Sequence, residues 1–145
     1  MLCQANILID DQLQVRICDI GQWDYAELQS TEPSHGSGCS GTPRYQAPEL
    51  INPKVPSPRK TIQSDIYALG MTMHHILTRM MPFHELKREE AVIMAVILGD
   101  RPLRLTSGDA AIWINDEAWT LITSCWHQDP YKRPTSSHVE HSVCL

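Results

Sequence analysis

The stretch TIQSDIYALGMTMHHILTRM, residues 61–80, decides the fold of this chain. Its apolar residues surround nearly the whole circumference of a helix, and a helix that is apolar all round is a buried one. Thr61 or Ser64 is suited to cap the helix where it begins. The stretch therefore predicts a buried central helix from about Thr61 to Met80. The prediction depends on Ile66, Tyr67, Leu69, Met71, Met73, Ile76, Leu77 and Met80.

Shorter elements are predicted on both sides of this helix. Residues 7–9 and 15–17 are short strand-like runs on either side of Asp10-Asp11-Gln12, a pattern that predicts a β-hairpin. Residues 22–44 are rich in Ser, Gly and Thr and predict a long loop, which in a compact domain is usually functional or disordered. The other expected elements are one or two helical turns over 46–52, a helix over 86–98 ended by Gly99-Asp100, a helix capped by Asn115, and a last helix from about Thr135.

The composition bounds the function classes. The chain has 145 residues, enough for one domain with one core, and a net charge of −5, which argues against a nucleic-acid partner. Its longest apolar run, AVIMAVIL at 91–98, is too short to cross a bilayer, so no membrane partner is expected. Five scattered cysteines without a C-x-x-C motif favour reduced thiols and a cytoplasmic protein. The pairs His74-His75 and His138-x-x-His141 lack a third ligand at a recognisable spacing for a metal.

Five motifs occur in a fixed order along the chain. They are NILID (6–10), ICDIG (17–21), GTPRYQAPEL (41–50), SDIYALGMTMHHIL (64–77) and CWHQDPYKRPT (125–135). Together they resemble the C-terminal lobe of eukaryotic protein kinases, in the tyrosine-kinase-like serine/threonine group. The resemblance implies a mainly α fold with one small β-hairpin. It makes residues 1–145 a partial protein kinase domain, from within the catalytic loop to the last helix.

The resemblance also implies a nucleotide and metal site. Asn6 matches the Asn of the catalytic loop and Asp19 matches the Asp of the D-F-G motif, so both are expected to bind Mg²⁺ and, through it, ATP. Their oxygen atoms are the kind of ligand that Mg²⁺ takes. Ile20 stands where the family has Phe; it is still apolar.

The chain departs from the family at its first residues. The catalytic Asp of the family falls on Met1, and the neighbouring Lys of serine/threonine kinases falls on Cys3. A methionine cannot accept the proton of a substrate hydroxyl. No G-x-G-x-x-G loop occurs in the sequence. The chain is therefore expected to be a truncated kinase that phosphorylates Ser/Thr on proteins only in a longer form, or else a catalytically silent, pseudokinase-like remnant that binds a protein partner.

Three further expectations follow from the resemblance. Residues 19–49 match the activation segment, with Ser40 and Thr42 as candidates for regulation and Tyr45 in the substrate-docking loop. Glu49 is expected to pair with Arg133, and Asp65 to be a buried brace for the catalytic loop, or simply an acid at a helix start.

The sequence also predicts an exposed apolar surface on the central helix, and it allows an interpretation other than a kinase. Without a preceding helix, the apolar surface around Met71, Ile76 and Leu77 is expected to be uncovered. A helical interaction domain with chance motif matches is the competing interpretation. It predicts neither the hairpin nor a contact between Glu49 and Arg133.

Overall fold

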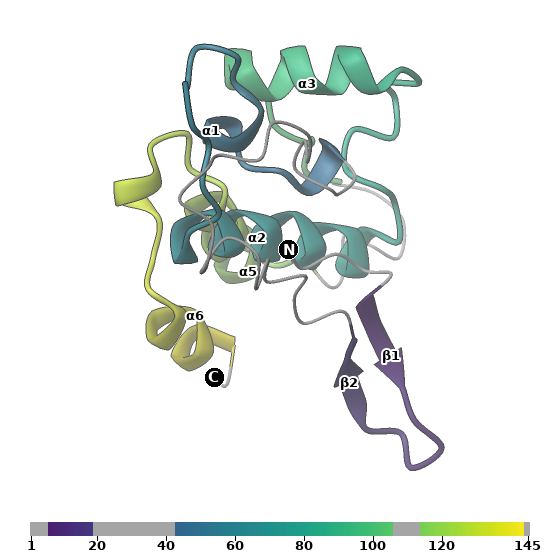
Figure 1. Cartoon of the computed structure of the whole chain (residues 1–145). Helices are drawn as coiled ribbons and strands as arrows, with labels where there is room; N and C mark the ends of the chain where they lie inside the picture. Colours follow the sequence, from purple (N-terminus) through teal and green to yellow (C-terminus); the bar gives the residue numbers. More distant parts are fainter. Residues whose placement is uncertain (1–5, 19–42, 106–113, 144–145) are drawn as a thin grey trace.

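The computed structural model describes residues 6–18, 43–105 and 114–143 (Figure 1). These ranges are mostly helical, and their only sheet is a two-stranded hairpin. The expected class, mainly α with one small hairpin, is confirmed. The elements are β1 (Ile7–Ile9), β2 (Val15–Ile17), η2 (Pro43–Tyr45), α1 (Pro48–Ile51), α2 (Ile62–Thr78), α3 (Glu89–Leu98), α5 (Asp116–Cys125), η3 (Pro130–Lys132) and α6 (Ser136–Val143).

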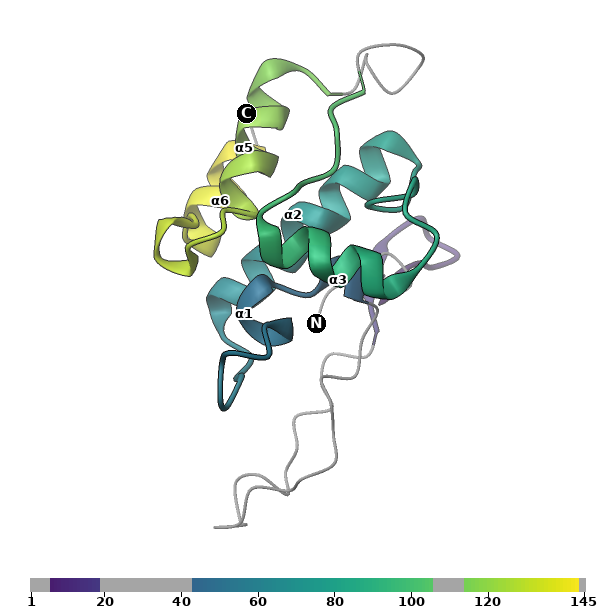
Figure 2. The same ribbon diagram turned by 90° about the horizontal axis from the view of Figure 1, so that it is seen from above.

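The helices form three levels, as Figure 1 shows from the front, while the view from above in Figure 2 shows α5 beside α2. The central level is α2 with α5 beside it, and their contact is the most extensive between any two elements. On one side lie α3 and α1, and on the other lies α6, which contacts α5. Within the described ranges, none of the helices has the length and apolar character to span a membrane.

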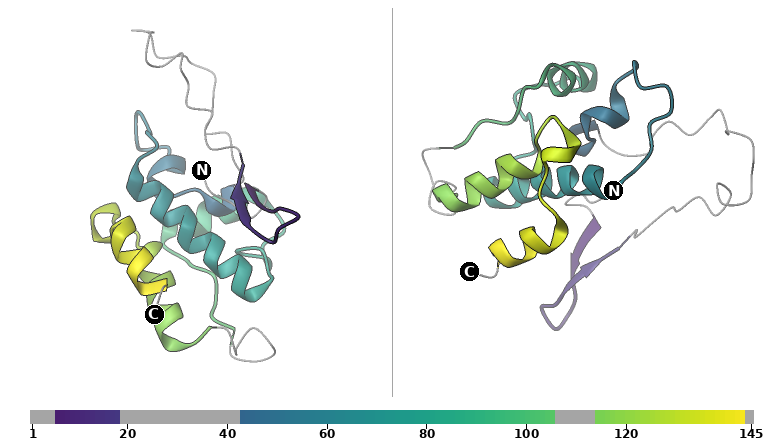
Figure 3. Two further views of the ribbon diagram at one scale, coloured as in Figure 1. Left: turned by 90° about the horizontal axis from the view of Figure 1, so that it is seen from below. Right: turned by 90° about the vertical axis from the view of Figure 1, so that its left-hand side faces the viewer.

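The hairpin forms from the two predicted runs and stands apart from the helices (Figure 3). Ile7 pairs with Ile17 across the two strands. Its turn is organised by Asp10, whose carboxylate accepts bonds from the backbone N–H groups of Gln12 and Gln14, both at 2.9 Å, and from Arg16 Nε at 2.8 Å. The bond from Gln14 and the Arg16 guanidinium hold the pKa of Asp10 below its usual value. The hairpin prediction is confirmed.

Helix α2 begins with a reciprocal capping box. The Ser64 N–H donates to Thr61 Oγ1 at 3.1 Å, while the Thr61 N–H donates to Ser64 Oγ at 2.9 Å. The helix ends at Arg79, which takes the left-handed conformation with φ 57°. The predicted helix and its cap are therefore confirmed. Its uniform burial is not, because Ile62 and Ile76 are exposed.

The main core lies between α2, α3 and α5. It contains Tyr67 and Met71 of α2, together with Phe83, Val92, Val96, Ile122 and Trp126. The expectation of an uncovered surface is wrong at Met71, which is 0% exposed because it points into this core. Ile76, 51% exposed, lies on the outer side of the same helix, and Leu77 is only partly buried.

A close approach between α2 and α5 depends on a residue without a side chain. A Cβ added to Gly70 would lie 2.8 Å from Cys125 Cβ and 3.3 Å from the Ile122 carbonyl oxygen. Those distances are too short for an unstrained contact, so only glycine allows the two helices to pack this tightly.

The outer helices follow their end signals. Asn115 caps α5 by accepting a bond from the Ala118 N–H at 2.7 Å, as predicted. Helix α3 starts at Glu89, three residues later than predicted, because Leu86 closes a turn onto the Phe83 carbonyl instead. It ends at Gly99, whose φ of 95° favours glycine, as expected from Gly99-Asp100.

Candidate functional site

The expected metal ligand Asn6 lies at the open end of the hairpin. It directly precedes β1, it is half-buried, and its carbonyl accepts the Cys18 N–H at 2.9 Å. The other residues expected at the catalytic centre, Met1 and Asp19, lie outside the described residues, as do Ser40 and Thr42. An amide oxygen from Asn6 with a carboxylate from Asp19 would make an oxygen donor set that suits Mg²⁺. In the described ranges, no group of three His, Cys, Asp or Glu residues is placed to hold a metal.

The segment over 43–51 is fixed to the helices at three points. The first is Arg44, a buried residue whose guanidinium donates to the carbonyl oxygens of Pro82 at 2.8 Å, Phe83 at 2.6 Å and Leu86 at 2.7 Å. Bonds of this kind to a charged donor are stronger than neutral ones. They tie η2 to the turn that follows α2.

The second point is a hydrogen bond from the same segment to α2. The Tyr45 hydroxyl lies 2.6 Å from His75 Nδ1, and the Tyr45 side chain is buried. Burial lowers the pKa of His75, so its ring is neutral at neutral pH, and with its proton on Nε2 it accepts a hydrogen bond from the Tyr45 hydroxyl at Nδ1. The segment thus has a second polar attachment that depends on protonation.

The third point is the ion pair between Glu49 and Arg133. Arg133 donates from Nη1 to Glu49 Oε1 at 2.6 Å and from Nη2 to Glu49 Oε2 at 2.8 Å, so the contact is bidentate. The Arg133 side chain is 0% exposed and that of Glu49 is 23% exposed. The expected contact is thus present, and together with the hairpin it is evidence against chance motif matches.

Arg133 also holds parts of the lobe beyond Glu49. Its Nη1 donates to the Gln63 carbonyl at 2.8 Å and its Nε donates to the His127 carbonyl at 2.9 Å. Its guanidinium carbon lies 5.1 Å from the ring centroid of Tyr67, a cation–π contact. We call this set, Glu49, Arg133 and the two carbonyls, the Arg133 anchor.

A second guanidinium contacts the same aromatic ring. Arg101 lies 5.2 Å from the Tyr67 ring centroid and donates to the Trp126 carbonyl at 2.8 Å and to Gln128 Oε1 at 2.6 Å. Burial raises the pKa of Tyr67 well above its ordinary value, so the phenol stays neutral between the two cations. The buried Tyr67 ring therefore packs against the guanidinium of Arg133 and helps to hold it in place.

Asp65 differs from its expected environment. Its side chain is exposed, so the expectation of a buried brace is wrong as to burial. The physical reason is its place in the first turn of α2, where Ser64 and Ile66 take the buried positions on either side. There a carboxylate interacts favourably with the helix dipole, as the simpler interpretation predicted. Its expected partners, residues 1–5, lie outside the described residues.

Sequence reasoning missed Arg44, His75 and Arg101 as attachment points. Arg44 had one usable signal, since it is a lone cation among residues expected to pack, in GTPRYQAPEL. His75 and Arg101 had none, because their partners Tyr45 and Gln128 are far away in sequence.

Comparison of the sequence with known proteins identifies the family. The family model described as protein kinase domain matches residues 2–144. A light-sensor protein kinase of Ceratodon purpureus is 34% identical over 85% of this chain and 10% of its own length. The serine/threonine/tyrosine-protein kinase HT1 of Arabidopsis thaliana is 29% identical over 92% of this chain and 31% of its own length. The serine/threonine-protein kinase CTR1 of the same plant is 28% identical over 95% of this chain and 15% of its own length.

The chain thus spans between about a tenth and a third of the length of these relatives. The family match covers nearly every residue, and the Arg133 anchor joins three motif regions of the structure, 43–51, 62–78 and 125–135. The chain therefore belongs to the eukaryotic protein kinase family, with the tyrosine-kinase-like serine/threonine kinases as its relatives.

Proposed function

We propose that this chain is the substrate-side lobe of a kinase that transfers the γ-phosphoryl group of ATP to Ser or Thr of a protein. The observation that supports this best is the fixed segment over 43–51. Arg44 attaches it to the turn after α2, Tyr45 attaches it to α2 itself, and Glu49 attaches it to Arg133 at the end of η3. Positioning of a protein substrate requires a segment that is held in one geometry.

The chemistry of the proposal assigns roles to few residues. Asn6 and Asp19 would hold Mg²⁺, which neutralises charge on the transferred phosphates when it is bound. Thr42 and Tyr45 would belong to the substrate-docking loop, as in the resembling kinases, with the buried Tyr45 holding that loop to His75. Met1 stands where the proton acceptor is needed, and Cys3 where a cation is needed. Neither a thioether nor a thiol supplies these functions. On this proposal, residues 1–145 alone do not transfer phosphate.

The alternative is a catalytically silent lobe that acts by binding a protein. Met1 and Cys3 favour it, because neither residue supplies the chemistry of transfer, while the Arg133 anchor consists of other residues. The cytoplasm is the compartment proposed for either form, on the basis of the scattered cysteines. Fractionation of cells with an antibody to the lobe would test that placement.

The deciding experiment is the intact mass and N-terminal sequence of the natural protein, enriched with such an antibody. Residues ahead of Met1 that supply an Asp, a Gly-rich loop and a strand Lys would support the kinase. A natural start at Met1 would rule out phosphoryl transfer and leave the binding role.

A binding measurement on residues 1–145 complements it. Calorimetric titration with Mg-ATP is expected to give no saturable heat, and incubation with γ-labelled ATP and a protein substrate is expected to give no transfer. A competent kinase in the same buffer is the positive control. Transfer by the chain alone would contradict the assignment of Met1.

A further inference from the structure

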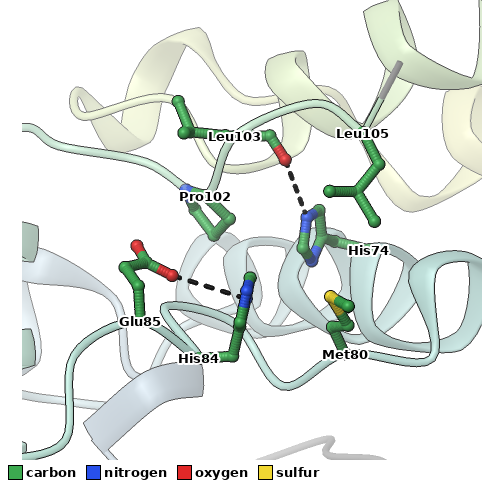
Figure 4. A pocket seen from close by; sticks show the side chains of 7 residues that line it. All are labelled: His74, Met80, His84, Glu85, Pro102, Leu103 and Leu105. Atoms are coloured by element: carbon green, nitrogen blue, oxygen red, sulfur yellow. Dashed lines mark hydrogen bonds and ion pairs between the residues drawn. The ribbon is translucent and has the colours of Figure 1, made fainter. Parts of the chain in front are cut away.

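A cavity of about 240 Å³ opens at the C-terminal end of α2, between the loop that follows this helix and residues 102–105. None of its lining residues belongs to the Arg133 anchor or to the expected magnesium site. Figure 4 shows the residues that line it, which are His74, Met80, His84, Glu85, Pro102, Leu103 and Leu105.

The wall of this cavity contains a buried polar atom without a partner. His74 is 2% exposed, and its Nδ1 makes no hydrogen bond with the described residues. Its Nε2 lies 3.4 Å from the Leu103 carbonyl oxygen. A carbonyl only accepts, so Nε2 must carry the proton, and Nδ1 is left with a free lone pair. In Figure 4 this second nitrogen lies on the side of the ring toward Met80 and His84.

The surroundings of His74 keep it an acceptor. Burial is the largest influence and lowers the pKa of its ring. The bond to Leu103 opposes burial less strongly, and the still smaller effects are those of His75 and His84, which lower the pKa, and of Glu85, which raises it. The ring is therefore neutral at neutral pH. Burying such an acceptor without a partner is unfavourable, so a donor that reaches Nδ1 would be bound favourably.

The other walls define what kind of molecule carries that donor. Met80, Pro102, Leu103 and Leu105 present apolar surface, and Met80 offers a thioether, which makes favourable contacts with aromatic rings. His84 Nδ1 lies 3.4 Å from Glu85 Oε2, and both side chains are half-exposed. These two residues therefore form a polar rim around the opening of the cavity. A single water needs two to four polar partners and would leave the apolar walls uncovered.

We propose that this cavity binds one phenol-like ring, with the ring against the apolar walls and its hydroxyl donating to His74 Nδ1. The volume of about 240 Å³ is below the range of roughly 300–1,000 Å³ for sites of drug-sized ligands, and it suits a single ring. The ring is a small free phenol or a tyrosine side chain of a protein partner, since both present the same chemistry.

The test compares two rings that differ only by the hydroxyl. The chain, labelled with ¹⁵N and ¹³C, is titrated with p-cresol and with toluene, and chemical shifts are followed by NMR. We expect saturable shifts at Leu103, Leu105 and the His74 ring nitrogens, with p-cresol binding about fivefold more tightly than toluene because of one hydrogen bond. Equal affinity for the two rings, or shifts that map elsewhere, would overturn the proposal.

A third probe separates the two sources of the ring. N-acetyl-tyrosinamide carries the same phenol on a peptide backbone. Binding of this compound to the same residues supports a tyrosine of a protein partner as the occupant. Binding of p-cresol alone supports a free phenol. If neither compound gives saturable shifts at these residues, the site does not exist as proposed.

Two variants and a control complete the design. His74→Phe keeps a ring of similar size but removes Nδ1, so p-cresol and toluene should then bind equally. Leu105→Trp fills the cavity from its wall and should abolish binding of both. Leu98→Trp, at an exposed position at the end of α3, is the matched control and should leave binding unchanged. If His74→Phe does not fold, the Leu105→Trp and Leu98→Trp pair still decides: unchanged binding in Leu105→Trp overturns the proposal.

Discussion

Replacing Arg133 by Met is predicted to destabilise the lobe far more than replacing any exposed charge. Met keeps much of the length of the arginine stem but removes the guanidinium. Four hydrogen bonds are lost, two to Glu49 and one each to the carbonyl oxygens of Gln63 and His127. The substitution leaves a carboxylate and two carbonyls without their donor.

The magnitude follows from burial. Breaking a buried ion pair by removing one partner costs about 3–5 kcal/mol, because the other charge stays behind unpaired. Glu49 is 23% exposed, so water can hydrate part of the orphaned carboxylate, and the lower limit of about 3 kcal/mol is expected. For a chain of this size that loss lowers the melting temperature by roughly 10 °C. Glu49→Gln should cost less, about 2 kcal/mol, because its amide oxygen still accepts one bond.

The assay is urea unfolding followed by tryptophan fluorescence, since Trp126 is buried in the core beside the anchor. Asp116→Asn is the matched control for Glu49→Gln. Asp116 pairs with Arg104 at 2.7 Å but is 91% exposed, so the same chemical change should cost under about 1 kcal/mol. In a double-mutant cycle, Glu49→Leu with Arg133→Met should cost less than the sum of the two single changes. The reasoning would be refuted if the urea midpoint of Arg133→Met equalled that of Asp116→Asn. It would also be refuted if the free-energy costs of Glu49→Leu and Arg133→Met simply added in the double variant.

Three further predictions use the same unfolding assay or a simple thiol test. Gly70→Ala should cost about 1–3 kcal/mol, since the new Cβ meets Cys125 Cβ at 2.8 Å; a stabilised variant would mean that α5 moves away freely. Thr61→Ala should cost about 1 kcal/mol by removing the cap that Ser64 uses, with Thr120→Ala, an exposed threonine of α5, as control. Burial raises the pKa of Cys125 to about 11, so its thiol is protonated at pH 8 and should react with a disulfide reagent only after unfolding. Fast labelling of Cys125 in the folded chain would contradict this.

The elements of the fold were predictable because each one carries its own local signal. Thr61 and Ser64 define the start of α2, Gly99 ends α3, and Asn115 starts α5. The hairpin was predictable from two short runs around Asp10, whose side chain then organises the turn. Local signals of this kind need no knowledge of the tertiary structure.

Burial on the central helix was not predictable in the same way. A helix that is apolar on all sides does not show which side faces the core, and so Met71 was expected to be uncovered although it is fully buried. Asp65 was expected to be buried only because of the resemblance to kinases, and its exposed position instead follows from its place in the first turn of α2. Phe83 adopts a left-handed conformation with φ 55° while buried, which its residue type gives no reason to expect.

The contacts of the candidate site also differ in whether the sequence could predict them. Glu49 and Arg133 are 84 residues apart, and only the resemblance to kinases indicated that they meet. The partners of Arg44 are backbone carbonyls in a turn, and no pattern of side chains encodes such acceptors. The cavity beside His74 was equally hidden, because it forms where the end of α2 meets a segment near residue 103.

The residues that hold the segment over 43–51 in place are different from the residues expected to take part in phosphoryl transfer. The Arg133 anchor joins Glu49, Gln63 and His127, and Arg44 joins η2 to the turn after α2. None of these contacts includes Asn6 or the position of Met1, so a change in the catalytic residues need not weaken the segment over 43–51. Conversely, Arg133→Met should lower stability without changing the ligands proposed for Mg²⁺. A chain with Met1 at the proton-acceptor position can therefore keep the attached segment over 43–51 as a surface for a protein partner. For this reason the fold does not distinguish the kinase from the silent binding lobe, and the sequence ahead of that position and Mg-ATP binding by the natural protein do.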